Sequence, residues 1–442
     1  PLRLVLAETL RMNENKIRII ASTIGGAFGL KMHGHPEEPL ICLMTKLIRR
    51  PVKWVENREE CLLIGAREQQ HKVEMAFDSD ANMIGLRDHV LANIGAPSAC
   101  PGWGMVFLTG LTMPGPYKVE NIDIHMNAVT TNKPSWNAAR GYGKETTAIA
   151  LELAMDNAAR QLGISPIDLR LRNFIKKDQF PYPSPTGLVY DSGDYGGVLL
   201  KALETIGYEG WKDKQKSALA EGRYIGIGMA FELTPEGGTI PGTMVAGYDS
   251  SSVRVGPDGT VRVLTGITSP GTHNGTAIAQ IVADELGIDI EGIEVLQGDT
   301  NSSPYGFGNY SGRSTIVGGG SAALAAKDVR DKINAVAAAL LEVEIDTLSL
   351  FEGIFSSSDN ADATLTFAEV CYASYTRAYD IAMCIDPPLE ATRTFKPPGI
   401  SHLPDKNGRI NPYPSYSNAV YVVVCEVDIE TGKISLLSLA AA

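Results

Sequence analysis

Hydrophobic positions recur along the first third of the chain with two periods, one typical of helices and one typical of strands. The helical period is clearest over residues 145–162, where apolar side chains three and four positions apart share one face and Gly163 ends the pattern. The pattern therefore predicts helices and strands in mixed order. Two more helices are expected over 37–49 and 166–172. Strands are expected over 16–21, over 52–56 and on both sides of the turn at 78–82.

A second mixed region is expected after residues 176–193, which are rich in Pro, Tyr, Ser and Gly and predict a linker. A long alanine-rich helix is expected over 320–341, whereas the Pro and Gly content of 351–414 predicts an irregular surface connection. Shorter helices are expected over 195–206 and 275–286. Strands are expected over 225–231, 243–255, 260–268 and 292–296. The predicted fold is α+β, with one domain over 1–175, a linker and connecting helix over 176–222, and a second domain over 223–442.

The composition narrows the class of protein. A length of 442 residues exceeds that of a typical single domain, and 44% hydrophobic with 20% charged residues is typical of a globular protein with a large core. The net charge of −12 argues against a nucleic-acid surface or an anionic membrane as the main partner, and no apolar run is long enough to span a membrane. Six scattered cysteines lack CxxC spacing, which disfavours iron–sulfur and zinc sites and favours free thiols in the cytoplasm.

The first candidate site is a glycine-rich loop over residues 24–31 (the first loop), where three glycines surround an aromatic residue between an expected strand and an expected helix. Glycines leave backbone amides uncovered, so a polar or anionic ligand can lie directly against the main chain. A tight strand-to-helix turn explains the same composition, and this loop alone does not decide between the two interpretations. The residues concerned are Gly25, Gly26, Ala27, Phe28 and Gly29.

Two later loops repeat this arrangement. The second loop (268–276) precedes the helix that carries Gln280, and the third loop (298–321) precedes the alanine-rich helix. Hydroxyl groups, an arginine and glycine amides at a helix N-terminus favour phosphate binding, although Ser321 alone would serve as a helix cap. Neither loop matches a Walker sequence or a dinucleotide fingerprint, which lowers ATP and NAD as candidate ligands. The candidate residues of these loops are Gly271, Thr272, His273, Asn274, Tyr310, Ser311, Gly312, Arg313, Ser314, Thr315, Gly319, Gly320 and Ser321.

A fourth segment (134–145, the arginine segment) places Arg140 and Gly141 among small residues before the expected helix. Arg140 is suited to steering an anionic or carbonyl substrate, or to pairing with Glu145, and both interpretations stay open. His33 and His35 alternate in a glycine-containing loop, but two such residues rarely bind a metal without a third ligand. A direct metal site is therefore not expected there.

In this order the four segments resemble the molybdenum-binding large subunit of the xanthine oxidase family, particularly its carbon monoxide dehydrogenase-like branch. The resemblance covers nearly the whole chain and is weak only over 342–414. It implies an α+β fold of two molybdopterin-binding domains, each partial because the chain looks incomplete at both ends. Further matching segments are 50–54, 58–60, 114–117, 154–156, 169–175, 184–187, 190–193, 280–284 and 298–300.

The resemblance also implies roles for the candidate residues. A pterin dithiolene holds the molybdenum in this family, so the protein supplies no direct metal ligand. Residues 25–29 would lie against the oxo ligands of the metal, with Phe28 near the substrate, while Arg140 and Gly141 would lie at the substrate pocket beside the cofactor. The second and third loops, with Gln280, would bind the pterin and its nucleotide tail, commonly a cytosine dinucleotide in bacterial members.

The implied reaction is hydroxylation of an aldehyde, an N-heterocycle or a related electron-poor carbon, with water as the source of oxygen. The implied cofactor is molybdopterin cytosine dinucleotide with molybdenum, and electrons would leave through 2Fe–2S centres to FAD on partner subunits. The expected partners are an iron–sulfur subunit, a flavin subunit, a further fragment of the molybdenum subunit and a small-molecule substrate.

Three departures from the family pattern keep an alternative open. Thr272 and Asn274 stand where the family usually has glutamine and histidine. Gly141 stands where carbon monoxide dehydrogenases have a copper-binding cysteine, so oxidation of carbon monoxide is not expected. The family's glutamate base belongs to a motif beyond residue 442, and no residue of this chain takes its place. The alternative is a non-catalytic paralogue that serves as a binding or assembly subunit.

Overall fold

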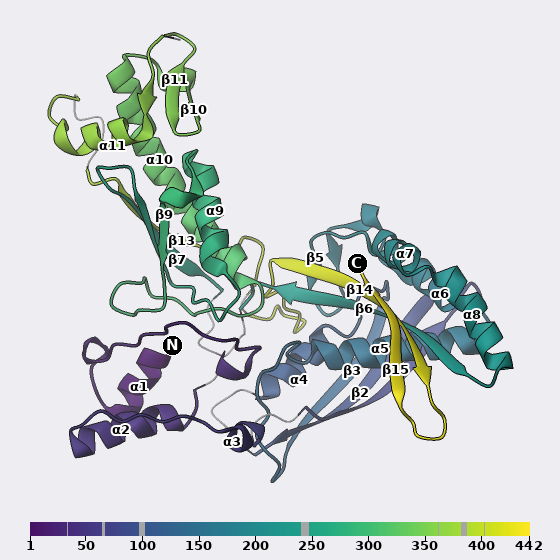
Figure 1. Cartoon of the computed structure of the whole chain (residues 1–442). Coiled ribbons are helices and arrows are strands. Elements are labelled where there is room, and N and C mark those ends of the chain that lie inside the picture. The colour runs from purple at the N-terminus through teal and green to yellow at the C-terminus, as the bar shows by residue number, and fades with distance from the viewer. Residues whose placement is uncertain are drawn as a thin grey trace. The chain divides into compact units, whose positions relative to one another are not determined.

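The computed structural model describes residues 1–32, 34–63, 67–96, 102–239, 247–360, 362–381, 387–401 and 403–442 (Figure 1). They form two compact units, each assembled from separate stretches of the chain. Unit 1 consists of Pro1–Ala27, Gly34–Trp54 and Gly237–Gly399. Unit 2 consists of Phe28–His33, Val55–Glu236 and Ile400–Ala442. The domains expected from the sequence are continuous stretches of the chain, whereas each compact unit combines several stretches. The predicted domain division stays a prediction.

The core of unit 1 lies between a four-stranded sheet and two helices. The strand order is β13-β7-β8-β9, antiparallel except for the parallel pair β8 and β9. Helix α10 contacts β7 and β13, and α9 contacts β9, so both helices cover this sheet (Figure 1). The elements are β7 (Asp249–Val255), β8 (Val261–Thr265), α9 (Asn274–Leu286), β9 (Ile293–Leu296), α10 (Gly320–Leu341) and β13 (Glu390–Phe395).

The prediction of an irregular surface connection over 351–414 is wrong for much of this stretch, in which β13 also lies. This region contains β11 (Ile354–Ser357), β12 (Leu365–Thr366) and α11 (Phe367–Thr376), and β10 (Leu348–Phe351) completes a small sheet with β11 and β12. Thr366 and Glu369 form a capping box that starts α11. The side chains of Phe355 and Val370 are fully buried in the core of unit 1, so tertiary packing outweighs the local Pro and Gly content.

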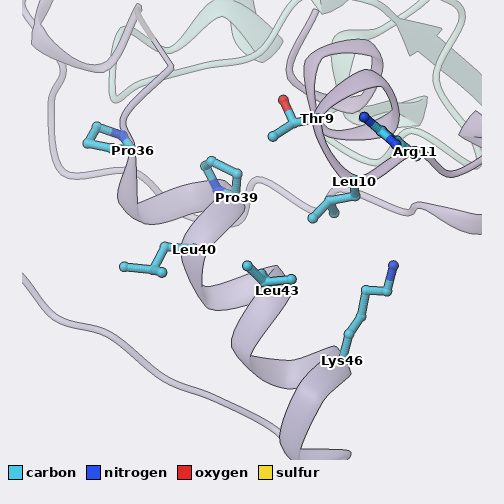
Figure 2. Close-up of a pocket in the computed structure, with 8 residues that line it drawn as sticks. All are labelled: Thr9, Leu10, Arg11, Pro36, Pro39, Leu40, Leu43 and Lys46. Atoms are coloured by element: carbon cyan, nitrogen blue, oxygen red, sulfur yellow. The ribbon is translucent and has the colours of Figure 1, made fainter.

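The N-terminal part of unit 1 contains α1 (Leu2–Leu10), the 3₁₀ turn η1 (Glu14–Lys16) and α2 (Glu37–Ile48). The helix expected at 37–49 is confirmed, whereas the strands expected at 16–21 and 52–56 do not form. Ile20 makes only an isolated bridge to Asp299, too little pairing for a ladder. Figure 2 shows a shallow pocket between the end of α1 and the face of α2. Its lining residues are Thr9, Leu10, Arg11, Pro36, Pro39, Leu40, Leu43 and Lys46.

Unit 2 contains two three-stranded sheets with helix α5 in contact with both. One sheet has the order β1-β2-β3, with β1 and β2 antiparallel and β2 and β3 parallel, and the other has the order β15-β14-β6. Helix α5 contacts β1 and β6, and α7 contacts β14 and β15. The strands are β1 (Gln69–Phe77), β2 (Met83–Gly95), β3 (Asn121–Thr130), β4 (Tyr182–Pro183), β5 (Val189–Tyr190), β6 (Tyr224–Glu236), β14 (Ser415–Val427) and β15 (Ile434–Ala441). The helices are α3 (Arg58–Leu62), α4 (Gly102–Leu111), α5 (Lys144–Leu162), α6 (Pro166–Asn173), α7 (Tyr195–Ile206) and α8 (Tyr208–Ala220).

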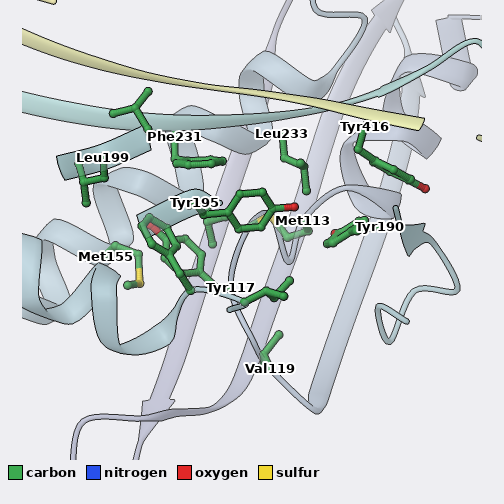
Figure 3. Packing of buried hydrophobic residues seen from close by; sticks show 14 of the residues in the cluster. Met113, Tyr117, Val119, Met155, Tyr190, Tyr195, Leu199, Phe231, Leu233 and Tyr416 are labelled. Atoms are coloured by element: carbon green, nitrogen blue, oxygen red, sulfur yellow. The ribbon is translucent and has the colours of Figure 1, made fainter. Parts of the chain in front are cut away.

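Several aromatic side chains pack against one another in the core of unit 2 (Figure 3). The rings of Tyr117 and Phe174 stack with centroids 5.3 Å apart, and Tyr195 meets Phe231 edge to face at 5.0 Å. Tyr190 is also fully buried, with its ring 4.9 Å from that of Tyr416. The segment expected to be a linker therefore contributes to the core, because its aromatic residues are apolar enough to be buried. None of the helices in the described ranges is long and apolar enough to span a bilayer.

Candidate functional site

The segment before the first loop is tied to the start of the third loop within unit 1. The Ala21 amide donates to the carbonyl of Gly298 over 2.7 Å, and the Thr300 amide donates to the carbonyl of Ile19 over 3.1 Å. Arg18 adds a bidentate ion pair with Asp299, whose Nε–Oδ1 distance is 3.0 Å. These bonds hold the chain that leads into the first loop against residues 298–300.

The Arg18 guanidinium lowers the pKa of Asp299 from its usual range to about 2, and backbone hydrogen bonding from the Asn301 amide lowers it further. A depressed carboxyl pKa stabilises the folded state above the pKa of the unfolded chain, about 3.9. We expect Asp299→Asn to lower the melting temperature at pH 7, and the gap to the wild type to close as the pH falls from about 4 to about 2. Thermal unfolding followed across this pH range tests the prediction, and a gap that does not change with pH contradicts it.

The first and second loops meet through their backbones. A Cβ atom at Gly271 would lie 3.2 Å from the carbonyl oxygen of Ile24 and 3.7 Å from the amide nitrogen of Gly26. Gly271 also has a φ of +99°, which favours glycine. A Cβ at Gly25 would meet nothing within 4 Å, so this side of the first loop is open. The part of the first loop up to Ala27 and the second loop therefore lie together within unit 1.

The second half of the first loop belongs to unit 2 and lies on the arginine segment. A Cβ at Gly29, where φ is +105°, would be 2.8 Å from the carbonyl oxygen of Ala138. Phe28 precedes it with a φ of +51° and a side chain that is 72% exposed. The candidate residues of the first loop are thus divided between the two units at Ala27 and Phe28.

We expect Gly29→Ala to destabilise the protein by more than about 1 kcal/mol, because its Cβ meets backbone atoms and its φ is strained. Gly25→Ala is the matched control, since its Cβ enters open space and the position has no positive φ. Urea unfolding of both variants provides the comparison. Equal losses of stability in the two variants would contradict the geometry.

In the arginine segment the sequence left open whether Arg140 pairs with Glu145. Glu145 instead accepts from Arg67 Nη1 over 3.0 Å and from the Gly143 amide over 2.8 Å. Arg140 is exposed and no ion pair joins it to a described residue. A Cβ at Gly141, where φ is +112°, would lie 2.2 Å from Glu145 Oε2, so this turn has no room for a cysteine unless Glu145 moves.

A buried polar network, which the sequence did not reveal, supports the end of this segment. Thr109 Oγ1 donates to the carbonyl of Gly143 over 3.0 Å and accepts from Gln69 Nε2 over 3.1 Å. Gln69 Oε1 lies 3.0 Å from His71 Nε2, and His71 Nδ1 lies 2.7 Å from the carboxylate of Asp88, which is fully buried. Strands β1 and β2 thereby brace the turn that follows Arg140.

A closed ring of four side chains joins the second loop to the third. Thr272 Oγ1 donates to Asn274 Oδ1 over 2.9 Å, and Asn274 Nδ2 donates to Ser314 Oγ over 2.9 Å. Ser314 Oγ in turn donates to Asn309 Oδ1, and Asn309 Nδ2 donates to Thr272 Oγ1 over 3.3 Å. The two residues that depart from the family pattern are therefore partners in the contact between these loops. Asn309 was not predicted, because its role depends on a fold in which distant loops meet.

Arg313 is fully buried and fixes the third loop to the start of β7. Its Nη2 donates to Asp249 Oδ2 over 2.8 Å and to the carbonyl of Tyr248 over 2.7 Å, and its guanidinium carbon lies 5.0 Å from the centre of the Tyr310 ring. Burial raises the pKa of Asp249, although hydrogen bonding from the Ser250 amide and the charge of Arg313 oppose the change. The guanidinium is therefore already engaged by the protein. Contact between Arg313 and a phosphate stays a prediction.

Gly319, Gly320 and Ser321 were expected at the N-terminus of the alanine-rich helix, but the helix begins before them. A π-helical segment η5 (Ser314–Gly319) runs directly into α10, so these residues lie inside a helix and not at its N-terminus. Ser321 Oγ is bonded to Ser251 Oγ over 2.8 Å and to the carbonyl of Gly318 over 2.9 Å, and it does not cap the helix. The glycines allow close packing, because a Cβ at Gly320 would lie 2.6 Å from the ring of Phe395 and one at Gly319 would lie 2.7 Å from Ile281. Binding of a cofactor by these three residues stays a prediction.

Unit 1 contains buried polar atoms that have no hydrogen-bond partner among the described residues. These atoms show whether the site suits a polar ligand. Tyr310 Oη, Gln297 Oε1, Ser303 Oγ and Arg313 Nη1 belong to this set. Burial raises the pKa of Tyr310 to about 12, so the hydroxyl keeps its proton near neutral pH and can donate. Gln297 lies beside the start of α9, since its Nε2 would be 3.6 Å from a Cβ at Gly275. Unsatisfied buried groups beside exposed hydroxyls and glycines fit a ligand rich in oxygen and nitrogen atoms.

The remaining candidate residues lie at the surface of unit 1. Gln280 is exposed on α9, six positions after the first residue of the helix. The other exposed candidates of the second and third loops are Gly271, Thr272, His273, Ser311, Gly312 and Thr315. His273 has a φ of +53° at the N-terminus of α9, where its carbonyl accepts from the Thr276 amide over 3.1 Å. The structure thus brings the first, second and third loops together in unit 1, and Phe28, Gly29 and the arginine segment together in unit 2.

Comparison with known proteins gives matches over nearly the whole chain. Residues 1–174 and 201–442 each match a model of the molybdopterin cofactor-binding domain. The carbon monoxide dehydrogenase large chain of Afipia carboxidovorans is 32% identical over 449 residues, which cover 98% of this chain and 53% of that protein. The nicotine 6-hydroxylase large subunit of Paenarthrobacter nicotinovorans is 30% identical over 444 residues, which cover 98% and 52%. The chain spans about half the length of the curated relatives it matches.

A solved structure gives the same result for the fold. The crystal structure of quinoline 2-oxidoreductase from Pseudomonas putida 86 superposes with a TM-score of 0.88 at 30% identity, covering 99% of this chain and 55% of that chain. The α+β fold expected from the sequence is confirmed. The chain belongs to the molybdopterin cofactor-binding domain family, which confirms its resemblance to the molybdenum-binding large subunits of the xanthine oxidase family.

Proposed function

We propose that this chain is the cofactor-binding part of a molybdenum hydroxylase that oxidises an aldehyde, an N-heterocycle or a related electron-poor carbon with water as the oxygen source. The observation that carries the proposal is the junction of the three glycine-rich loops in unit 1. The ring of hydrogen bonds between the second and third loops, and the close approach of Gly271 to Ile24 and Gly26, support a single preorganised binding surface.

Molybdopterin with its metal would supply the oxidation chemistry when bound. In unit 1, the open face of the first loop at Gly25 would receive the cofactor, the hydroxyl of Tyr310 would donate to one of its oxygen atoms, and Gln297 would accept from one of its N–H groups. The junction of the second and third loops would hold the nucleotide tail, which we propose to be cytosine dinucleotide. Arg313 would act indirectly, by fixing the loop that carries Tyr310.

Unit 2 would supply the substrate contacts. Arg140 is exposed and retains its donors, so its guanidinium would orient a carbonyl or carboxylate group of the substrate. Phe28 would offer an apolar ring face to the substrate, as its 72% exposure permits. Gly141 has no thiol to bind copper, which argues against oxidation of carbon monoxide.

The relatives extend well beyond the matched region, and their printed names describe subunits of larger enzymes. We therefore propose that an iron–sulfur subunit with 2Fe–2S centres, a flavin subunit with FAD and a further segment of the molybdenum subunit complete the enzyme. That further segment would carry the glutamate base, which we assign to no residue of this chain.

The second candidate function is a non-catalytic paralogue that serves as a binding or assembly subunit. One observation favours it. Thr272 and Asn274 are hydrogen-bonded to each other and to Asn309 and Ser314, so their polar atoms are already engaged within the protein. A paralogue of this kind would keep the fold, but its changed loops would have lost the cofactor.

Substrate-dependent reduction of the purified complex separates these functions. We expect anaerobic addition of an aromatic N-heterocycle or an aldehyde to bleach the flavin and iron–sulfur absorbance, with ¹⁸O from labelled water in the product. Arg140→Ala should lower kcat/KM by at least about tenfold at unchanged molybdenum content, since the loss of a charged hydrogen bond costs about 1.5–3 kcal/mol. A complex that contains no molybdenum and that neither substrate class reduces would support the paralogue and overturn the hydroxylase.

A further inference from the structure

A second cluster of chemically competent side chains lies on the solvent-facing side of the β1-β2-β3 sheet in unit 2. The parallel strands β2 and β3 pair Arg87 with Asp123 and His89 with His125. Residues two apart on a strand point to the same face. Because Asp88 is buried and its two neighbours on β2 are exposed, these four side chains point away from the core.

The geometry brings two imidazoles and one carboxylate within the reach of a single ion. One ligand atom from each of His89, Asp123 and His125 can be chosen so that all three lie within 4.8 Å of one another. The rings of His89 and His125 have centroids 4.9 Å apart, and His125 Nε2 lies 2.9 Å from Asp123 Oδ1. Ligands at about 2.1 Å from a tetrahedral ion are about 3.4 Å apart, so small rotations of exposed side chains complete the site.

We propose that His89, His125 and Asp123 bind a late first-row divalent metal ion, with Zn²⁺ as the representative ion and water as the remaining ligand. Two imidazoles and one carboxylate suit Zn²⁺, Cu²⁺ or Ni²⁺ and are poorly matched to Mg²⁺ or Ca²⁺, which prefer all-oxygen ligands. None of the three residues belongs to the glycine-rich loops or to the arginine segment. The site is therefore separate in its residues from those proposed for the molybdenum cofactor.

Arg87 sets the affinity of this site. Its Nε donates to Asp123 Oδ2 over 2.8 Å and its Nη1 donates to Glu74 over 3.0 Å. This hydrogen bond lowers the pKa of Asp123 and also occupies one of its two carboxylate oxygens. The positive charge of Arg87 also repels a cation, and on the β1 side Lys72 faces His89 while pairing with Glu74 at 3.9 Å.

Substitutions of Arg87 and of the two histidines should change the metal affinity in opposite directions, which distinguishes a metal site from three side chains that are merely close together. Removal of the Arg87 guanidinium should tighten binding, since one carboxylate oxygen is released and one repelling charge is lost. Removal of either histidine should weaken it.

The test is a Zn²⁺ titration of the purified full chain by isothermal calorimetry at pH 7.5 with excess Mg²⁺. We expect one saturable site, a loss of affinity of at least about tenfold in His89→Ala and in His125→Ala, and a gain of affinity in Arg87→Gln. Asn127→Ala, on the same exposed face of β3, is the matched control and should bind as the wild type does. Circular dichroism verifies that each variant is folded.

A spectroscopic measurement makes the assignment independent of affinity. Cu²⁺ bound to the wild type should give an electron paramagnetic resonance spectrum with hyperfine coupling to two nitrogen atoms, and each histidine variant should lose one of them. The absence of a saturable Zn²⁺ site, or Zn²⁺ binding that survives both histidine substitutions, overturns the proposal. Molybdenum content serves as a separate readout and should not change in these variants.

Discussion

Replacement of Arg313 by methionine is expected to cost about 3–5 kcal/mol of folding free energy and to abolish retention of molybdopterin. Arg313 and Asp249 are both fully buried, and the guanidinium also satisfies the carbonyl of Tyr248. Without Arg313 the carboxylate of Asp249 is left as an uncompensated buried charge, and Tyr310 loses the cation that its ring contacts. Urea unfolding and molybdenum analysis of the purified protein measure the two effects.

Two further variants separate folding from binding at this position. Arg262→Met removes an exposed arginine that pairs with Glu294 on the same sheet, and it should leave stability and molybdenum content almost unchanged. The double variant Arg313→Met with Asp249→Leu removes both charges, so it should regain much of the lost stability. It should still bind the cofactor poorly, because the third loop remains detached from β7. Full molybdenum content in the double variant would contradict the positioning role of Arg313.

Replacement of Arg170 by methionine is the second large expected effect, at about 3–5 kcal/mol, and it acts in the other unit. Arg170 donates to Glu152 Oε2 over 2.8 Å and to Asp156 Oδ1 over 2.7 Å, with its own side chain only 1% exposed. Tyr117 Oη donates to the other oxygen of Glu152 over 2.6 Å. The substitution leaves the buried carboxylate of Glu152 without its cation, which is the costly half of breaking such a pair.

The pH dependence of this variant follows from the direction of the Glu152 shift. Burial already raises the pKa of Glu152, and loss of Arg170 removes a group that opposes this rise. A raised carboxyl pKa destabilises the folded state above the unfolded value of about 4.3 and has no effect below it. The deficit of Arg170→Met should therefore shrink as the pH falls from 7 towards 4. Arg172→Met, exposed on the same helix α6, is the control and should show little loss at any pH. A deficit that grows in acid would contradict this account.

The sequence predicted those elements whose hydrophobic pattern extends over many residues. Helices α5 and α10 and the hairpin of β1 and β2 appear where the periodicity placed them. The expected strand at 16–21 failed because its only partner is a short segment at 298–300, which gives one bridge and not a ladder. Helix α11 and its small sheet were missed because α11 packs on α10 and Phe355 of β11 is buried in the same core, and no local pattern records such contacts.

The candidate site could be predicted as a set of loops but not as a network. Glycines and hydroxyls are visible in the sequence, whereas Asn309 and Asp249 acquire their roles only when distant segments meet. The glycines before α10 were interpreted as bare amides at a helix N-terminus, but they lie inside a helix and allow its close packing against Phe395 and Ile281. The same residue type serves both purposes, and only the path of the backbone separates them.

The central claim is that this chain binds a molybdenum pterin that carries a cytosine nucleotide. The most direct measurement is the content of molybdenum and of acid-released cytidine monophosphate in the complex purified from a host that makes this cofactor. We expect one of each per chain, with both lost in Arg313→Met and both kept in Arg262→Met. A folded wild-type complex that contains neither molybdenum nor cytosine nucleotide would contradict the claim.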